Sequence, residues 1–222
     1  PGAAAADSSR SSAAAGSSRS SAAAGSSRSS AAAGSSRSSA AAGPSLRLFV
    51  ALEFPAPARA ALAAFRDAAA DPEVWRPVAD EAIHLTLAFL GRRPAEDVAT
   101  IEPVLHAAAG PAPRLALGGA LLLPPRRARV LCADLDDRDG TLAALQSRVS
   151  DGLAAAGVYT PEKRPFRAHA TVARLRSRAR APRSVDAAPE PLEFAGEALT
   201  LFVSRLHPHG ARYEPLVRVN LH

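Results

Sequence analysis

Ile83–Leu90 (IHLTLAFL) and Phe166–Arg174 (FRAHATVAR) each carry a His-x-Thr triplet inside an apolar run of strand length. The triplets are HLT at 84–86 and HAT at 169–171. In a β-strand, the side chains of residues i and i+2 point to the same face. Each triplet is therefore predicted to present an imidazole and a hydroxyl group side by side, with its middle residue turned away.

The flanks of the two triplets also resemble each other. RLFVALE, which starts at Arg47, leads through a predicted helix to IHLTLAF, and RVLCADL, which starts at Arg129, leads through another to AHATVAR. This repetition is too weak to establish a duplication. It does favour two lobes of related topology, each of which delivers one His-x-Thr on a strand.

Hydrophobic periodicity and the positions of Pro and Gly predict an α+β fold with two pseudo-symmetric lobes. The expected strands are 46–53, 83–90, 114–123, 128–135, 169–173, 198–206 and 213–219, and the expected helices are 58–70, 95–109 and 141–156.

Two imidazoles, each with a hydroxyl group beside it, suit acid–base catalysis on a phosphodiester. A single His-x-Thr means little, but two in a chain of this composition are expected by chance in only about one sequence in a hundred. Cleavage of a phosphodiester needs one group that deprotonates the nucleophile and another that protonates the leaving oxygen. Histidine titrates near neutral pH, so His84 and His169 are candidates for the two roles. The hydroxyls of Thr86 and Thr171 would donate hydrogen bonds to phosphate oxygens.

Metal binding by the two histidines is the competing interpretation. It leaves the threonine at i+2 without a purpose, and no carboxylate cluster accompanies the triplets. We therefore expect neither a metal nor a cofactor. The chain has one cysteine, Cys132, which excludes an intramolecular disulfide framework and any cysteine-rich zinc site. We expect this residue to be buried in a strand and unreactive.

The triplets and their flanks resemble the paired motifs of the 2H phosphoesterases. The strongest likeness is to the RNA 2',3'-cyclic phosphodiesterases, also called 2'-5' RNA ligase-like proteins. RLFVALEFP from Arg47 and LTLFVSRLHPHGARYEPL from Leu199 are similar to the same group, so the resemblance covers residues 45–219. The resemblance implies an α+β fold of two pseudo-symmetric lobes, each an antiparallel sheet with helices outside, that face each other across a central cleft. It also implies hydrolysis of a ribose 2',3'-cyclic phosphate to a 2'-phosphomonoester, with RNA as the substrate. If a 5'-hydroxyl takes the place of water and the same chemistry runs in reverse, the resemblance also implies 2'-5' ligation.

The resemblance also assigns roles to residues. His84 would be the proton donor to the departing 3' oxygen, and His169 the proton acceptor from water. Arg174 would approach the phosphate or ribose, although five residues from His169 it should face away from the cleft unless the strand ends there or a bulge intervenes.

Three further residues are weaker candidates. Arg167 lies two residues before His169, so its side chain should point to the same face and contact the phosphate. The alternative interpretation is a solvated charge at the end of the strand. Phe49 resembles an aromatic residue that packs by the terminal base, and core packing is the alternative for it. Tyr213 lies in the closing segment and is the least favoured of the candidates.

The first 43 residues differ from the rest of the chain. Four copies of Ser-Ser-Arg-Ser-Ser-Ala-Ala-Ala-Gly begin at Ser8, Ser17, Ser26 and Ser35. This repeat offers no bulky apolar face and cannot offset the entropy of ordering, so we predict a disordered tail at 1–43 and a bilobal domain at 44–222. An organelle transit peptide and weak attraction to RNA or DNA phosphates remain alternatives for the tail. Because the tail holds four Arg and one Asp, it carries half of the formal net charge of +6.

Composition narrows the remaining classes. No stretch approaches the ~18 consecutive apolar residues of a membrane-spanning helix, so we expect no membrane association. We expect a cytoplasmic monomer that acts on RNA with a 2',3'-cyclic phosphate terminus. Two alternatives stay open: an RNA-end binding module with little turnover, and a phosphodiesterase for another cyclic phosphate, such as ADP-ribose 1'',2''-cyclic phosphate or a cyclic nucleotide.

Overall fold

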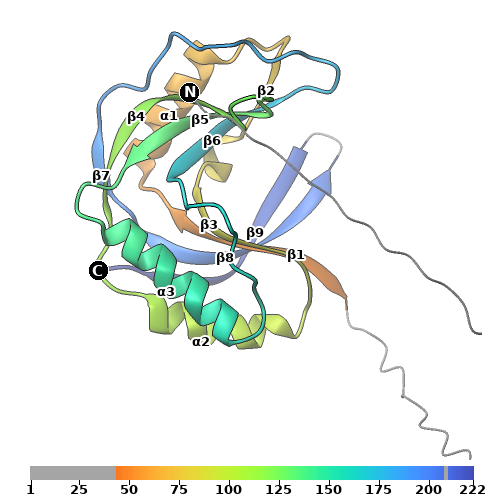
Figure 1. Cartoon of the computed structure of the whole chain (residues 1–222), viewed down its shortest axis with the longest axis vertical. Coiled ribbons are helices and arrows are strands. Elements are labelled where there is room, and N and C mark those ends of the chain that lie inside the picture. The colour runs from red at the N-terminus through yellow and green to blue at the C-terminus, as the bar shows by residue number, and fades with distance from the viewer. Residues whose placement is uncertain (1–43, 208–209) are drawn as a thin grey trace, which may run out of the picture. The chain divides into compact units, whose positions relative to one another are not determined.

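The two His-x-Thr segments lie in different β-sheets of the computed structural model, which describes residues 44–207 and 210–222 (Figure 1). The predicted tail at 1–43 lies outside the described residues. In chain order the elements are β1 (Ser45–Glu53), α1 (Ala56–Ala69), β2 (Trp75–Pro77), the 3-10 turn η1 (Asp80–Ala82), β3 (Leu85–Pro94), α2 (Asp97–Ala108), β4 (Arg114–Leu123), β5 (Val130–Asp136), α3 (Thr141–Ala155), β6 (His169–Leu175), β7 (Glu193–Ala195), β8 (Ala198–His207) and β9 (Gly210–Asn220).

Both sheets are antiparallel, as predicted. Sheet A has the strand order β3-β1-β8-β9, and sheet B has the order β2-β6-β5-β4-β7. The strand pairs expected from the repeated pattern are adjacent, because β1 pairs with β3 and β5 pairs with β6. The α+β fold with two facing sheets is therefore confirmed.

The helices cross between the two sheets. Helix α1 follows β1 of sheet A but packs against β6 of sheet B, whereas α3 joins two strands of sheet B but packs against β3 of sheet A. Figure 1 shows α2 and α3 together beside sheet A. Each sheet is thus covered by a helix from the other strand–helix–strand unit. The expectation of helices outside each sheet holds, but the helix of each unit does not cover its own sheet.

The hydrophobic core follows the two-residue period of the strands. Leu48, Val50 and Leu52 of β1 are buried on the helix-covered face of sheet A, and Leu131 and Ala133 of β5 occupy the equivalent face of sheet B. Residues from both sheets and all three α-helices join one contiguous cluster of buried side chains. The opposite faces of the two sheets carry the His-x-Thr side chains.

A glycine sets the distance between two of the helices. A Cβ atom at Gly152 of α3 would lie 2.7 Å from Cγ1 of Val104 in α2. That separation is too short for real carbon atoms, so a side chain at this position would push α2 and α3 apart.

Several element boundaries differ from the prediction. Helix α1 begins at Ala56 rather than Ala58, because Pro57 is tolerated in a first turn, where its missing N–H has no partner to lose. The strand expected at 83–90 runs from Leu85 to Pro94, so His84 lies immediately before it. Strands β2 and β7 were not predicted, because three residues are too few to show alternation.

Within the described residues, no helix is long and apolar enough to cross a membrane.

Candidate functional site

His84 is held by a backbone carbonyl at the junction of η1 and β3. Its Nδ1 lies 2.8 Å from the carbonyl oxygen of Ala82, and its Nε2 lies 3.2 Å from Oγ1 of Thr86. A carbonyl oxygen only accepts hydrogen bonds, so Nδ1 carries a hydrogen and donates it. Nε2 is therefore the nitrogen available for proton transfer, and the hydroxyl of Thr86 is beside it.

His169, the first residue of β6, is held in the same way. Its Nδ1 lies 2.8 Å from the carbonyl oxygen of Arg167. In both histidines, the partner is the carbonyl of the residue two positions earlier. This shared arrangement fixes the ring orientation and assigns Nε2 as the exchangeable position in each case.

The two pairs meet at one small cavity of about 30 Å³. Its lining residues come from the segment before β3, from β3 and β9 of sheet A, and from β6 of sheet B. They are Val78, Ala82, His84, Thr86, His169, Thr171, Arg174 and Tyr213. The cavity thus brings together residues 84 and 169, which are far apart in the sequence. Two imidazoles and two hydroxyls around one hollow can hold a phosphate and exchange protons with it from two directions.

An aromatic cluster encloses the ring of His84. Phe49 stacks on it with ring centroids 5.0 Å apart, Tyr213 meets it edge-on at 5.3 Å, and Phe202 lies beyond at 6.0 Å. Burial disfavours the charged imidazolium and lowers the pKa of His84 to about 4, although the bond to the Ala82 carbonyl opposes this shift. His84 is therefore neutral at physiological pH.

Phe49 and Tyr213 have different positions in this cluster. Phe49 is only 4% exposed and packs against both His84 and Phe202, so its main contacts are within the protein. Tyr213 lines the central cavity, and its hydroxyl lies 3.5 Å from Nη2 of Arg174, which donates a hydrogen bond to it. The least favoured sequence candidate thus lies at the centre of the site.

Arg174 reaches the cavity because β6 contains a bulge. Opposite β5, Leu131 pairs with Ala173 and Cys132 pairs with Thr171, so Val172 has no opposite residue. The extra residue reverses the parity of the strand, and the side chain five positions from His169 returns to the cleft side. Arg174 lines the central cavity together with both histidines.

Arg167 contributes more through its backbone than through its charge. Its guanidinium is 3.3 Å from a carboxylate oxygen of Asp134, and this ion pair is exposed. Its side chain lines a groove beside His169 rather than the central cavity. The structure therefore places Arg167 next to the site, with its carbonyl orienting His169.

Cys132 lies beneath Thr171, with Sγ 3.6 Å from Oγ1. The residue is fully buried, and burial raises the pKa of its thiol to about 11. A thiol with such a pKa stays protonated at neutral pH and is a poor nucleophile. This agrees with the expectation of a buried, unreactive cysteine.

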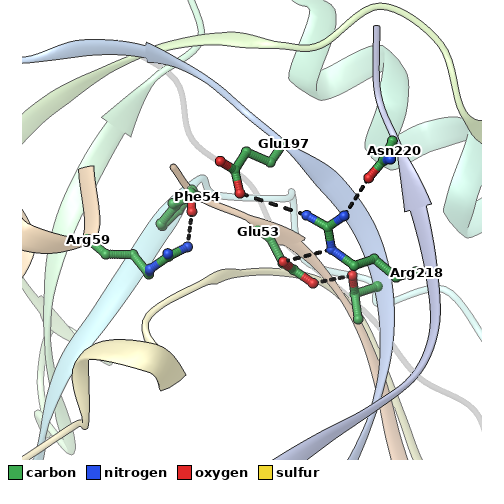
Figure 2. A network of polar contacts seen from close by, with 7 residues as sticks. Glu53, Phe54, Arg59, Glu197, Arg218 and Asn220 are labelled. Atoms are coloured by element: carbon green, nitrogen blue, oxygen red, sulfur yellow. Dashed lines mark hydrogen bonds and ion pairs between the residues drawn. The ribbon is translucent and has the colours of Figure 1, made fainter. Parts of the chain in front are cut away.

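A polar network fastens the ends of three strands of sheet A beside His84 (Figure 2). The carboxylate of Glu53, at the end of β1, accepts hydrogen bonds from the hydroxyl of Thr200 on β8 and from Nε of Arg218 on β9, the latter at 3.1 Å. Arg218 also contacts Glu197 at 3.8 Å and Asn220. Glu53 lines the same hollow as His84, and its negative charge opposes the lowering of the His84 pKa.

Arg76 is a residue of the site that the sequence did not indicate. It lies on the short strand β2, where it pairs with Arg174, and it lines a hollow of about 470 Å³ with His84 and Phe49. The three-residue strand that carries it gives no periodic signal, so nothing in the sequence separated Arg76 from the other arginines.

Among residues 44–207 and 210–222, no three His, Cys, Asp or Glu side chains gather in an arrangement that could hold a metal ion.

Comparison with known proteins agrees with this geometry. Residues 54–208 match the 2'-5' RNA ligase superfamily. The chain is 32% identical to an RNA 2',3'-cyclic phosphodiesterase of Thermus thermophilus, over 79% of this chain and 90% of the relative. It is 31% identical to an RNA 2',3'-cyclic phosphodiesterase of Escherichia coli, over 78% of this chain and 94% of that relative.

Solved structures give the same result. A crystal structure of a Thermus thermophilus protein superposes with a TM-score of 0.69 at 32% identity, covering 79% of this chain and 98% of that one. Escherichia coli LigT, complexed with 3'-AMP, also superposes with a TM-score of 0.69, at 30% identity, covering 80% and 99%.

Proposed function

This chain belongs to the 2'-5' RNA ligase superfamily, and from that membership we propose that it is an RNA 2',3'-cyclic phosphodiesterase that forms 2'-phosphomonoesters. The observation that carries the proposal is the convergence of two His-x-Thr pairs on one cavity, each with its histidine Nδ1 bonded to a carbonyl. This arrangement suits a single phosphate attacked from one side and released on the other.

The proposed reaction has His169 as base and His84 as acid. Nε2 of His169 takes a proton from water as its oxygen attacks phosphorus, and the bond from phosphorus to the 3' oxygen breaks. Nε2 of His84 donates its proton to that leaving oxygen. Thr86, Thr171 and Arg174 hold the non-bridging oxygens, where negative charge accumulates.

His84 must be protonated to act as the acid, although burial lowers its pKa to about 4. A cyclic phosphate bound in the cavity brings a negative charge next to the imidazole, and a nearby opposite charge favours the protonated form. We propose that substrate binding raises the pKa of His84, so that the imidazole becomes protonated and can act as the acid. The aromatic cluster then serves to keep His84 uncharged until an anion arrives.

The same groups can catalyse a ligation. If the 5'-hydroxyl of a second RNA replaced water at His169, its oxygen would bond to phosphorus, the 3' oxygen would leave with the proton of His84, and a 2'-5' phosphodiester would result. No ATP is needed, because the strained cyclic ester supplies the driving force. In water we expect hydrolysis to dominate.

The experiment that tests this function is product analysis on a dinucleotide 2',3'-cyclic phosphate in the presence of EDTA. We expect a 2'-phosphate product at an undiminished rate under chelation. A 3'-phosphate product would contradict the assigned leaving group, and loss of activity with EDTA would contradict catalysis by histidines alone.

The alternatives give different results in the same assay. Tight binding of the dinucleotide without turnover would indicate an RNA-end binding module. Faster turnover of ADP-ribose 1'',2''-cyclic phosphate or of a cyclic nucleotide would assign the site to another cyclic phosphate. Preference for the RNA end over these compounds is what the proposal requires.

A further inference from the structure

A second, larger hollow starts at the catalytic centre on the side of His169. This groove, with a volume of about 690 Å³, includes Thr86 and His169 in its lining but not His84. The hollows beside His84 include neither His169 nor Thr171. The phosphate site therefore opens in two directions, and the groove is the route from its His169 side.

Three separate segments form the groove. One wall is β3 from Thr86 to Phe89, another is the 159–167 segment between α3 and β6, and the third is the turn between β4 and β5 around Pro124. Gln146 and Ser150 of α3 complete the lining. Because Thr86 and His169 form one end of the groove, whatever occupies the groove is continuous with the substrate.

Two exposed aromatic rings line this groove. Phe89 is 43% exposed and Phe166 is 36% exposed. Among the described residues, four large hydrophobic side chains are exposed, and the two aromatic ones of this set both face this groove. Exposed aromatic faces beside a nucleotide site suit the stacking of nucleobases, which depends on flat surfaces rather than on base identity.

The exposure of Phe89 results from a bulge that matches the one in β6. Opposite β1, Val50 pairs with Ala88 and Ala51 pairs with Thr86, so Leu87 has no opposite residue. Phe89, five residues after His84, therefore returns to the cleft side, just as Arg174 does five residues after His169. The guanidinium carbon of Arg47 lies 4.9 Å from the centroid of the Phe89 ring.

The charge of the groove is positive. Its lining includes Arg129, Arg164 and Arg167, with Glu162 as its carboxylate. Arg167 is paired with Asp134 and Arg164 lies 3.5 Å from Glu162, whereas Arg129 forms no ion pair within the described part of the chain. Arginines between exposed aromatic rings match a nucleic-acid strand, which alternates phosphates and bases.

We propose that this groove binds a single-stranded RNA segment, with bases stacked on Phe89 and Phe166 and phosphates near Arg129 and Arg164. The proposal rests on the cyclic phosphodiesterase function. The segment has two possible sources with the same chemistry. It is either the substrate chain leading up to the cyclic phosphate, or a second strand whose 5'-hydroxyl replaces water at His169.

The first experimental arm tests the substrate chain. It compares kcat/KM for a mononucleoside 2',3'-cyclic phosphate with that for a tetranucleotide ending in the same group. If the groove holds the substrate chain, the wild type prefers the tetranucleotide by about tenfold or more, and Phe166→Ala or Phe89→Ala removes that preference. Phe166→Ala keeps wild-type kcat/KM on the mononucleotide, because Phe166 lines the groove but not the hollows that contain His84. Leu216→Ala, which truncates an exposed apolar side chain outside the groove, is the matched control.

The second arm tests the second strand. A tetranucleotide with a 5'-hydroxyl and no terminal phosphate is added to the mononucleotide reaction, and its inhibition constant and any 2'-5' ligated product are measured. If the groove holds the second strand, Phe166→Ala raises the inhibition constant about tenfold and lowers the ligated product equally.

Binding of a fluorescent RNA tetranucleotide that lacks terminal phosphates provides a readout that does not depend on catalysis. The variant with both Arg129→Gln and Arg164→Gln should reduce the slope of log K against log salt by about 1.4, while Arg114→Gln, outside the groove, leaves it unchanged. Unchanged tetranucleotide kinetics, inhibition and salt slope in these variants would overturn the groove proposal. A wild type that binds this RNA through the groove but hydrolyses no cyclic phosphate would instead overturn the proposed function.

Discussion

At the scale of single residues, the two histidines share one constraint but differ in environment. Each imidazole donates its Nδ1 hydrogen to the carbonyl two positions earlier, so both present Nε2 for proton transfer. Only His84 is enclosed by aromatic rings, and burial lowers its pKa to about 4. Separate environments for two chemically identical groups are a general way to give them opposite roles.

The low pKa of His84 predicts a pH dependence of stability. The unfolded chain protonates this histidine near its ordinary pKa of 6.5, whereas the folded chain does so only near 4. Between these pH values the unfolded state binds more protons than the folded state. The stability that the neutral His84 contributes is therefore lost as the pH falls from 6.5 to 4. On lowering the pH from 7 to 4.5, the free energy of unfolding should fall by about 2 kcal/mol more in the wild type than in His84→Gln.

Urea titrations at the two pH values measure this difference. His106→Gln, which removes an exposed histidine on α2, should behave like the wild type. An equal pH dependence in the wild type and His84→Gln would contradict the buried, neutral His84.

The position of Arg174 predicts a direct role in turnover. Arg174→Ala should lower kcat/KM for a cyclic phosphate by about 100-fold, as expected when a preorganised donor to a phosphate oxygen is lost. Arg174→Lys should recover part of the loss, because the ammonium retains the charge but not the planar fork. Arg176→Ala is the control, since Arg176 lies two residues further on and donates to the carbonyl of Pro72. Equal kinetics for Arg174→Ala and Arg176→Ala would exclude this role.

At the scale of elements, the approach to His84 is fixed by helix α1. The guanidinium of Arg66, buried in the helix face, lies 2.6 Å from the carbonyl oxygen of Val78 and 2.6 Å from a carboxylate oxygen of Asp80. Asp80 opens η1, the turn whose last residue, Ala82, accepts the hydrogen bond of His84. Arg66 thereby connects a helix on the outside of sheet B to the orientation of a catalytic side chain.

Removal of this connection should affect both stability and activity. Arg66→Met should lower the free energy of unfolding by about 2 kcal/mol, because it removes the charge-assisted hydrogen bonds that the buried guanidinium donates to the Val78 carbonyl and to Asp80. It should also lower kcat, since the Ala82 carbonyl is no longer held. Arg93→Met breaks a partly exposed ion pair with Asp97 instead and should cost less than about 1 kcal/mol with no change in kcat. Thermal unfolding and steady-state kinetics on both variants decide this point.

The elements also show what the sequence could and could not predict. The two-residue period and the Gly and Pro positions predicted every strand longer than three residues, and parity placed His84, Thr86, His169 and Thr171 on the cleft face. The alternation of side-chain direction gave the wrong face for positions after a bulge, because a bulge depends on how the strand pairs with its neighbour. The bulge in β6 had been named as the condition for Arg174, whereas the matching bulge in β3, which exposes Phe89, was not foreseen.

At the scale of the whole molecule, the crossed helices join the two sheets into one folding unit. Helix α1 covers sheet B and helix α3 packs on sheet A. If one sheet unfolds, the other therefore loses the helix that buries its apolar face. The crossing was not predictable from the chain, since periodicity shows that a helix has an apolar face but not which sheet that face contacts.

This arrangement predicts a single unfolding transition. Trp75 is the only tryptophan and is buried at the edge of sheet B, so its fluorescence reports on that sheet, whereas far-UV circular dichroism reports on the whole fold. The two signals should give the same urea midpoint and the same slope. Separate midpoints would show that the sheets unfold independently and would contradict this account of the crossing.

The central claim is that His84 is the acid and His169 is the base of one reaction. The most direct measurement is single-turnover cleavage of a dinucleotide cyclic phosphate whose 3' oxygen is replaced by sulfur. A thiolate leaves without needing a proton. With the ordinary substrate, His84→Ala and His169→Ala should each lose about 100-fold or more in rate. With the sulfur substrate, His84→Ala should recover to near the wild-type rate while His169→Ala stays impaired. Recovery of His169→Ala instead would reverse the assigned roles, and wild-type turnover of the ordinary substrate by either variant would contradict the two-histidine mechanism.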